Sequence, residues 1–419
     1  MSTVYAKAAI ACVLMLAAIL ISEGAKRRCP QGCLPLRQTI LLAITVRAAL
    51  FVLVFAILKM PLGSDVPAYY YPQSHATLAG ELWNRDFQSS YSPLFPYLGA
   101  VLLKIADTPL VFCVFALCLD VVALYYWHQV LKKTGSEDSA ATVSLAYALS
   151  GPVILNALVG QQQIWIGAGL AFSAWLLLSD RPLASALVQG VVLCVTKILA
   201  LLFWPVLWAA EKRKIVWASA AGMLPVVVLP VFVFAGANVL RGLRAEQMDF
   251  TSGNLVYYVS FLLDVSPAAS STSDAVAVLC LGAAALATLW RFMRSEGGNA
   301  ERLIGATAFI FIVLMLASKK SYANYLSFAY YPLLFVLYRH LRGRAFWVMS
   351  LVFAAVSSMQ ASLWFARGGN GLSLSEWIAQ SGLVAALPTI GVEAILIAIY
   401  VAILIWSGRD LFQNKSTPI

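Results

Sequence analysis

The stretch from Thr39 to Met60 decides the fold and reads TILLAITVRAALFVLVFAILKM. A helix of about 20 mostly apolar residues crosses the roughly 30 Å hydrocarbon core of a bilayer. Similar stretches recur throughout the 419 residues, of which 61% are hydrophobic and only 11% are charged, whereas soluble proteins are about a quarter charged. The sequence therefore predicts an all-α fold, a polytopic transmembrane helical bundle that forms a single integral-membrane domain over residues 1–419.

Short basic clusters separate the apolar stretches and predict the topology. Because Lys and Arg concentrate in cytoplasmic loops, the side that receives these clusters is assigned to the cytoplasm. The net charge of +10 thus indicates topology, and no nucleic-acid partner is expected. About 11 to 13 spans are expected, including a retained first helix (4–21) and a hairpin, 183–197 with 198–210, that turns near Lys197. The clusters are 26–28, 132–133, 180–181, 211–214, 291–294, 339–344 and 409.

The longest outer segment, residues 61–108, begins PLGSDVPAYYYP and contains Asp65. A lone carboxylate at the mouth of a membrane span is suited to be a catalytic base, and it is also typical of a turn acid that caps the next helix. Between 72 and 86, the helical spacing of Leu78 with Leu82 and of Ala79 with Trp83 predicts a short amphipathic helix on the membrane surface. Segment 61–108 is therefore predicted to hold interfacial helices and the candidate base.

Five cationic side chains on the predicted outer side are candidates for binding an anion such as a phosphate. Lys197 interrupts a nearly apolar stretch, which is costly unless the side chain pairs, functions or snorkels to the interface. Lys319 and Lys320 violate the positive-inside pattern, so either they bind an anion or the predicted topology is wrong there. Arg241 and Arg244 share their segment with two acids, which makes mutual ion pairing an equal alternative to substrate contact.

Polar and aromatic residues on the same side are candidates for sugar or acceptor binding. Gln161, Gln163, Tyr91 and Tyr322 could hydrogen-bond sugar hydroxyls, although aromatic residues also populate membrane interfaces for other reasons. His75 could serve likewise, or could simply be exposed to solvent. Two acids inside predicted spans are expected to pair with Ser, Thr or Trp donors on neighbouring helices rather than to take part in chemistry; they are Asp120 and Glu393.

The sequence contains no motif for nucleotide binding or for zinc chemistry. It contains no Walker-type or Rossmann glycine loop and no His-Glu-x-x-His pattern, so neither cytoplasmic nucleotide use nor zinc is indicated. A divalent metal could bridge Asp65 and a phosphate, but one carboxylate is a thin ligand set. No cofactor and no metal site are therefore predicted.

Several stretches, taken in order, resemble the GT-C superfamily of polyprenyl-phosphate-sugar glycosyltransferases. The resemblance is greatest to the bacterial polyprenol-phosphate-mannose-dependent mannosyltransferases and to the GPI mannosyltransferase I group. Asp65 matches the acidic residue of the family's first outer loop, and Tyr91–Tyr97 (YSPLFPY) resembles its Tyr-Pro-Pro-Leu stretch. The other similar patches are the Pro…Gly-Gln segment 150–161, the Gly…Lys…Pro hairpin 190–205 and the Lys…Tyr segment 318–325.

This resemblance implies a GT-C fold and the transfer of a hexose, with inversion, from a polyprenyl-phosphate donor. The sugar would be mannose, the acceptor a lipid-linked or cell-envelope glycan, and the general base Asp65. The active site would face the periplasm or exterior of a bacterial inner membrane. Two features depart from the family: Gln163 occupies the position of a second acid, and helix 4–21 is an additional element. The alternative functions are a transporter or flippase of a lipid-linked anion, and a non-catalytic scaffold.

Overall fold

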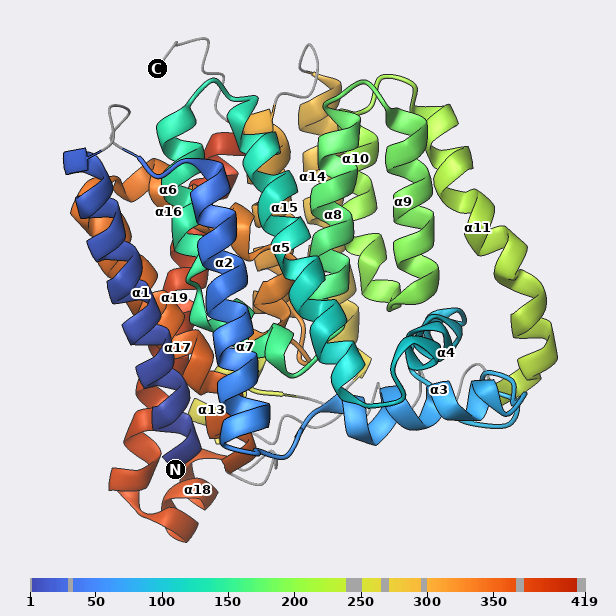
Figure 1. Ribbon diagram of the computed structural model, residues 1–419, viewed down its shortest axis with the longest axis horizontal. Helices are drawn as coiled ribbons and strands as arrows, with labels where there is room; N and C mark the ends of the chain where they lie inside the picture. The colour runs from blue at the N-terminus through green and yellow to red at the C-terminus, as the bar shows by residue number, and fades with distance from the viewer. Residues whose placement is uncertain are drawn as a thin grey trace.

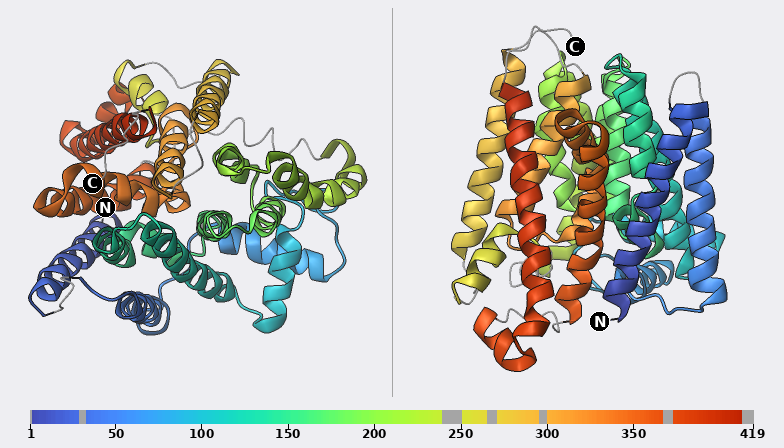
Figure 2. Two further views of the ribbon diagram at one scale, coloured as in Figure 1. Left: turned by 90° about the horizontal axis from the view of Figure 1, so that it is seen from above. Right: turned by 90° about the vertical axis from the view of Figure 1, so that its left-hand side faces the viewer.

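The computed structural model describes residues 2–28, 33–238, 251–264, 271–294, 300–366 and 373–412. Every regular element in this described part is a helix, and it contains no strand. The long helices stand side by side, as Figure 1 shows from the side and Figure 2 shows end-on. The predicted all-α membrane bundle is confirmed.

Eight helices within the described residues are long and apolar enough to cross a membrane. A ninth span arises if α6 (Glu137–Ala148) and α7 (Gly151–Leu158), which meet at an angle of 49°, are taken together. The eight are α1 (Ser2–Arg28), α2 (Leu36–Phe51) continued by η1 (Val52–Ile57), α5 (Leu110–Lys132), α11 (Lys214–Ala235), α14 (Ser271–Met293), α15 (Ala300–Ala317), α17 (Gly343–Ala366) and α19 (Leu383–Phe412).

Shorter apolar helices account for the difference from the roughly 11 to 13 spans expected from sequence. Three of them stand among the long helices, namely α8 (Gln163–Leu177), α9 (Pro182–Val195) and α10 (Trp204–Ala210) with its 3₁₀ entry η3 (Ile198–Phe203). The predicted hairpin is confirmed, because Thr196 and Lys197 leave helical geometry between α9 and η3. The remaining elements are η4 (Gly236–Asn238), α13 (Leu255–Leu262), η5 (Ala323–Phe328), α16 (Tyr330–Leu341) and α18 (Leu374–Ser381).

The two ends of the bundle differ in charge. At one end lie α3 (Tyr71–Leu78) and the start of α1; this is called the α3 end, and α19 ends at the opposite, basic end (Figures 1 and 2). The last turns of α1, α5, α14, α16 and α19 carry Lys or Arg there. Ion pairs such as Arg339–Glu301 at 2.6 Å join neighbouring helices at the basic end. The basic clusters thus gather on one side, as the alternation predicts.

The segment that follows η1 folds into short helical pieces at the α3 end. A π-helical turn, η2 (Val66–Tyr70), leads directly into α3, and α4 (Phe95–Ile105) packs against α3 where Gly99 meets Ser74. The short helix expected between 72 and 86 exists, but it starts earlier and ends at Leu78, because Gly80 adopts a φ of +88° that breaks the helix. Trp83 consequently lies in the following loop rather than on the helix.

A buried ion pair lies between two spans of the bundle. The Arg47 Nε of α2 donates to an Asp120 carboxylate oxygen on α5 at 2.7 Å, and these residues are 2% and 0% exposed. The Tyr147 hydroxyl donates to the other Asp120 oxygen at 2.7 Å, and Arg47 also donates to the Ala148 carbonyl at 2.8 Å, where α6 ends. The network therefore joins α2 and α5 to the end of α6, where the chain bends into α7.

The partners predicted for the two buried acids were wrong in kind. Asp120 pairs with an arginine and a tyrosine instead of a Ser, Thr or Trp donor. Glu393 on α19 accepts a hydrogen bond from the Gln360 amide at 3.2 Å. A buried carboxylate is stabilised best by a cation or by several donors, and Arg47 was overlooked because it sits inside the apolar stretch 39–60.

Candidate active site

Asp65 lies at the α3 end, half-buried, immediately before η2. Its carboxylate makes no capping hydrogen bond to that helix, so the alternative of an ordinary capping acid finds no support here. Instead it accepts a hydrogen bond from the Tyr91 hydroxyl at 3.2 Å, across 26 positions of sequence. Among the described residues, Tyr91 is the sole hydrogen-bond donor to this carboxylate.

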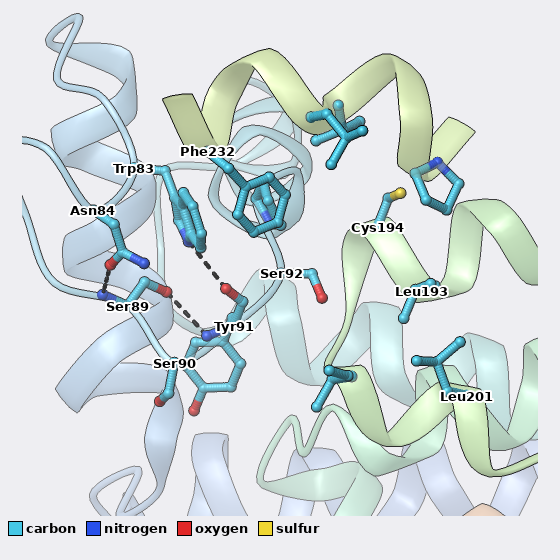
Figure 3. A pocket seen from close by; sticks show the side chains of 15 residues that line it. Trp83, Asn84, Ser89, Ser90, Tyr91, Ser92, Leu193, Cys194, Leu201 and Phe232 are labelled. Carbon is cyan, nitrogen blue, oxygen red and sulfur yellow. Dashed lines mark hydrogen bonds between the residues drawn. The ribbon is translucent and has the colours of Figure 1, made fainter. Parts of the chain in front are cut away.

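Tyr91 is held firmly by the loop that precedes α4. Its main-chain carbonyl accepts from the Trp83 indole at 3.0 Å, and its N–H donates to the Ser89 hydroxyl at 3.2 Å (Figure 3). Its ring packs edge-on against Tyr70 at 5.0 Å and lies 4.6 Å from the ring of Phe95, between centroids. The side chain is only 4% exposed, so its hydroxyl has a fixed direction.

Lys197 reaches the same tyrosine from the α9–η3 turn. Its Nζ lies 4.7 Å from the centre of the Tyr91 ring, within the range of a cation–π interaction. Two backbone hydrogen bonds join the turn to the loop, from the Ser92 N–H to the Thr196 carbonyl at 2.8 Å and from the Leu94 N–H to the Cys194 carbonyl at 3.0 Å. The fold thereby brings Asp65 and Lys197 onto one tyrosine, although 131 intervening residues separate them in sequence.

The turn between α7 and α8 borders this cluster. Gly160 has a φ of +71°, and a Cβ there would lie 2.7 Å from the Val66 side chain, so glycine permits both the turn and its approach to η2. The Gln162 N–H donates to the Tyr70 hydroxyl at 3.3 Å. Gln161, Gln162 and Gln163 are each at most 5% exposed, and their side-chain carbonyl oxygens have no hydrogen-bond partner in the described structure.

Burial fixes the protonation of the two central tyrosines. Loss of solvation, followed by nearby acidic groups that include Asp65, raises the pKa of Tyr70 well above its usual value. Burial likewise raises the pKa of Tyr91, with further contributions from Tyr70 and Asp65. Both phenols therefore stay protonated at neutral pH, and Tyr91 acts as a hydrogen-bond donor to the carboxylate.

A largely apolar groove of about 270 Å³ opens beside this cluster. The loop 83–93 forms one wall, with Trp83, Ser89 and Tyr91, and the other wall comes from the α9–η3 turn and α11 (Figure 3). The Trp83 ring contacts Phe232 of α11 at 5.2 Å between centroids. The apolar residues of the second wall are Leu193, Cys194, Ile198, Leu201, Pro225, Val228, Leu229 and Phe232.

The other predicted site residues are distributed around this centre. His75 on α3 contacts Asp107 at 2.8 Å on the exposed surface. Lys319 is buried and forms an ion pair with Asp274 of α14 at 2.8 Å. Lys320 and Tyr322 are half-buried, and Tyr322 lies near enough to Tyr70 to affect it electrostatically. Arg241 and Arg244 lie outside the described residues.

Sequence reasoning missed the role of one residue that shapes the site. Trp83 was assigned to a surface helix, yet it is buried and fixes Tyr91. Tyr70, a possible sugar contact by sequence, joins Tyr91 to the glutamine turn. No group of three or more His, Cys, Asp or Glu side chains arranged to hold a metal occurs in the part of the chain that the structure describes.

The structure is that of a polytopic helical membrane protein in which Asp65 and Lys197 meet one tyrosine beside an apolar groove at the α3 end. The family model of glycosyltransferase family 87 matches residues 90–319, more than half of the chain. The protein therefore belongs to this GT-C-like family of membrane glycosyltransferases. The match includes Tyr91, Gln161, Lys197 and Lys319, whereas Asp65 precedes it. A search of curated proteins found no match.

Proposed function

We propose that this glycosyltransferase transfers a hexose, mannose by the resemblance noted above, from a polyprenyl-phosphate donor to a lipid-linked or cell-envelope glycan acceptor. The observation that carries the proposal is the convergence of Asp65 and Lys197 on Tyr91. One carboxylate and one cation at the same end of the bundle supply the two functions that the reaction needs. Membership in glycosyltransferase family 87 favours an enzyme over the transporter or scaffold.

Asp65 is the proposed general base. The acceptor hydroxyl loses its proton to the carboxylate while its oxygen forms a bond to the anomeric carbon. The bond between that carbon and the phosphate oxygen breaks from the opposite face, which gives inversion at the sugar and releases the polyprenyl phosphate. One base is sufficient because no covalent enzyme intermediate forms, so the glutamine at position 163 is compatible with this chemistry.

Lys197 is the proposed primary contact for the donor phosphate. Fixed cations at a developing charge lower the barrier because they need no reorganisation during the reaction. The Lys197 ammonium lies 4.7 Å from the centre of the Tyr91 ring, and Tyr91 and Ile198, the residue after Lys197, both line the apolar groove. Further support for the phosphate is proposed from Lys319 and Lys320 and, outside the described residues, from Arg241 and Arg244.

The groove is the proposed site for the first isoprene units of the donor. Its lining by leucine, isoleucine, valine and phenylalanine fits a hydrocarbon chain, and it ends at Tyr91, beside the proposed phosphate site. Sugar hydroxyls would then meet the buried amides of Gln161 and Gln163, whose carbonyl oxygens are available as acceptors. The remaining proposed sugar or acceptor contacts are His75, Tyr91 and Tyr322.

The proposed topology places the α3 end on the non-cytoplasmic side. The basic end carries the clusters that positive-inside sorting retains in the cytoplasm. We therefore propose a bacterial inner membrane with the site facing the periplasm or exterior. We also propose that residues 1–419 form one integral-membrane domain, in which segment 61–108 presents the base.

A donor panel tests this function directly. Purified protein in lipid nanodiscs is incubated with radiolabelled undecaprenyl-phosphate mannose, glucose or galactose and with extracted membrane lipids as acceptors. The expected result is transfer from the mannose donor and a new labelled lipid or glycan. Binding of none of the three donors, measured by thermal shift, would contradict the proposed substrate class.

A further inference from the structure

Tyr91 touches both halves of the proposed machinery through different parts of its side chain. The hydroxyl donates to Asp65 at 3.2 Å, while the face of the ring lies 4.7 Å from the Lys197 ammonium. Asp65 and Lys197 do not form a direct ion pair with each other in the described structure. Tyr91 thus contacts both the proposed base, Asp65, and the proposed phosphate-binding cation, Lys197.

We propose that Tyr91 is a positioning residue that aims the Asp65 carboxylate through its hydroxyl and seats the Lys197 ammonium on its ring. This inference rests on the proposed function, because it assigns Asp65 the base role and Lys197 the phosphate role. It goes beyond the sugar or acceptor contact proposed above, since the hydroxyl already donates to Asp65 and the ring already faces Lys197.

The rigidity of Tyr91 supports a positioning role. The Trp83 indole holds its carbonyl and the Ser89 hydroxyl holds its N–H (Figure 3). The ring packs against Tyr70 and Phe95. A side chain fixed at both backbone and ring cannot rotate to follow its partners. The partners must therefore adopt the positions that the tyrosine dictates.

The hydroxyl has a direct consequence for the base. A hydrogen bond donated to one carboxylate oxygen fixes the plane of the carboxylate. The second oxygen is then free to accept the proton of an acceptor hydroxyl. The titratable or charged groups around this carboxylate are Tyr70 of η2, Tyr91 of the loop and Lys197 of the turn, with Tyr322 beyond Tyr70.

The ring has a separate consequence for the cation. The aromatic face attracts the Lys197 ammonium and holds it in place, and this contact does not need the tyrosine hydroxyl. Two substitutions at the same position can therefore separate the two roles, since Tyr91→Phe removes only the hydroxyl, while Tyr91→Leu removes both hydroxyl and ring.

The experiment compares wild type, Y91F and Y91L in nanodiscs with radiolabelled undecaprenyl-phosphate mannose, over about pH 4 to 9. For Y91F, kcat is expected to fall about tenfold with little change in donor KM, because a hydrogen bond to a charged group is lost. For Y91L, donor KM should also rise about tenfold.

Tyr71 provides a matched control. Its hydroxyl donates to Asp107 at 3.0 Å on the exposed surface, so Y71F removes the same kind of tyrosine–aspartate bond outside the site. Y71F should leave kcat, KM and the pH profile unchanged. Thermal shift with undecaprenyl phosphate provides a second measurement, in which Y91F binds like wild type and Y91L binds more weakly.

The possible failures are distinguishable. If wild type neither binds undecaprenyl phosphate nor transfers mannose, the proposed function fails. If wild type transfers mannose but Y91F retains its kcat, only the positioning role is wrong. Equal losses of kcat and equal rises of donor KM in Y91F and Y91L would reduce Tyr91 to packing and would also overturn the inference.

Discussion

Asp120 and Asp65 each accept a hydrogen bond from a tyrosine hydroxyl, and each has a basic residue nearby, but their surroundings differ. In the core, Asp120 accepts from Tyr147 on one oxygen and from Arg47 on the other, and it is completely buried. At the α3 end, Asp65 accepts from Tyr91 alone and is half-buried, and its lysine sits across the ring.

The difference teaches how to distinguish a structural carboxylate from a reactive one. Both oxygens of Asp120 are occupied by donors, so no substrate proton can reach them. Asp65 keeps one oxygen available and has a cation close but not paired with it. The same residue types therefore join helices in the core and form a candidate active site at the α3 end. The difference is whether both carboxylate oxygens already accept hydrogen bonds.

The largest expected effect comes from exchanging Asp65 for asparagine. Transfer should fall by about 10²- to 10⁴-fold, the usual contribution of a general base, while the thermal stability and the affinity for undecaprenyl phosphate stay near those of wild type. The rate is measured in nanodiscs with labelled donor, and stability by thermal unfolding in detergent. If D65N transfers the sugar at the wild-type rate, Asp65 is not the base, and the contrast between Asp65 and Asp120 no longer holds.

The core pair should respond in the opposite way. Arg47→Met leaves the Asp120 charge buried without its cation, which costs about 3 to 5 kcal/mol of stability. The transfer rate per folded molecule should change far less than in D65N. The double variant R47M/D120L should recover much of the lost stability, because it removes both charges. If R47M unfolds no earlier than wild type, Asp120 is stabilised by something other than this pair.

The contrast also shows what sequence could and could not predict. The span at Thr39–Met60 was predictable, because hydrocarbon thickness fixes how many apolar residues a helix needs. The turn at Lys197 was predictable too, since a charge inside an apolar stretch must reach an interface or a partner. Arg47 inside the first span drew no attention, because its partner lies 73 positions away on another helix.

The candidate site was only partly predictable, for reasons of geometry. Asp65 was identified by its position after a span, but its contact with Tyr91 depends on a loop without any periodic pattern. The helix expected between 72 and 86 ends early at Gly80, whose positive φ no hydrophobic spacing could reveal. Trp83 therefore turned inward and became a support of Tyr91, which the pattern of Leu78 and Leu82 did not indicate.

Lys197→Met sharpens the comparison of the two basic residues. If Lys197 serves the donor phosphate, the affinity for undecaprenyl phosphate should fall about 10- to 100-fold, since a charge-assisted contact is lost. Stability should change less than in R47M, because Lys197 is half-buried whereas Arg47 is 2% exposed. The matched control is Lys133→Met at the basic end, where the lysine bonds the Leu178 carbonyl. An equal loss of affinity in both variants would exclude a specific role for Lys197.

The smallest expected effect tests the tyrosine of the core. Tyr147→Phe removes one hydrogen bond to a charged group that keeps its arginine, so a loss of about 1.5 to 3 kcal/mol in stability is expected. The acidic limb of the pH–rate profile should stay where it is, because Asp120 never exchanges a proton with substrate. A shift of that limb in Y147F would show that Asp120 affects the transfer reaction. The structural and catalytic roles could then no longer be assigned to separate aspartates.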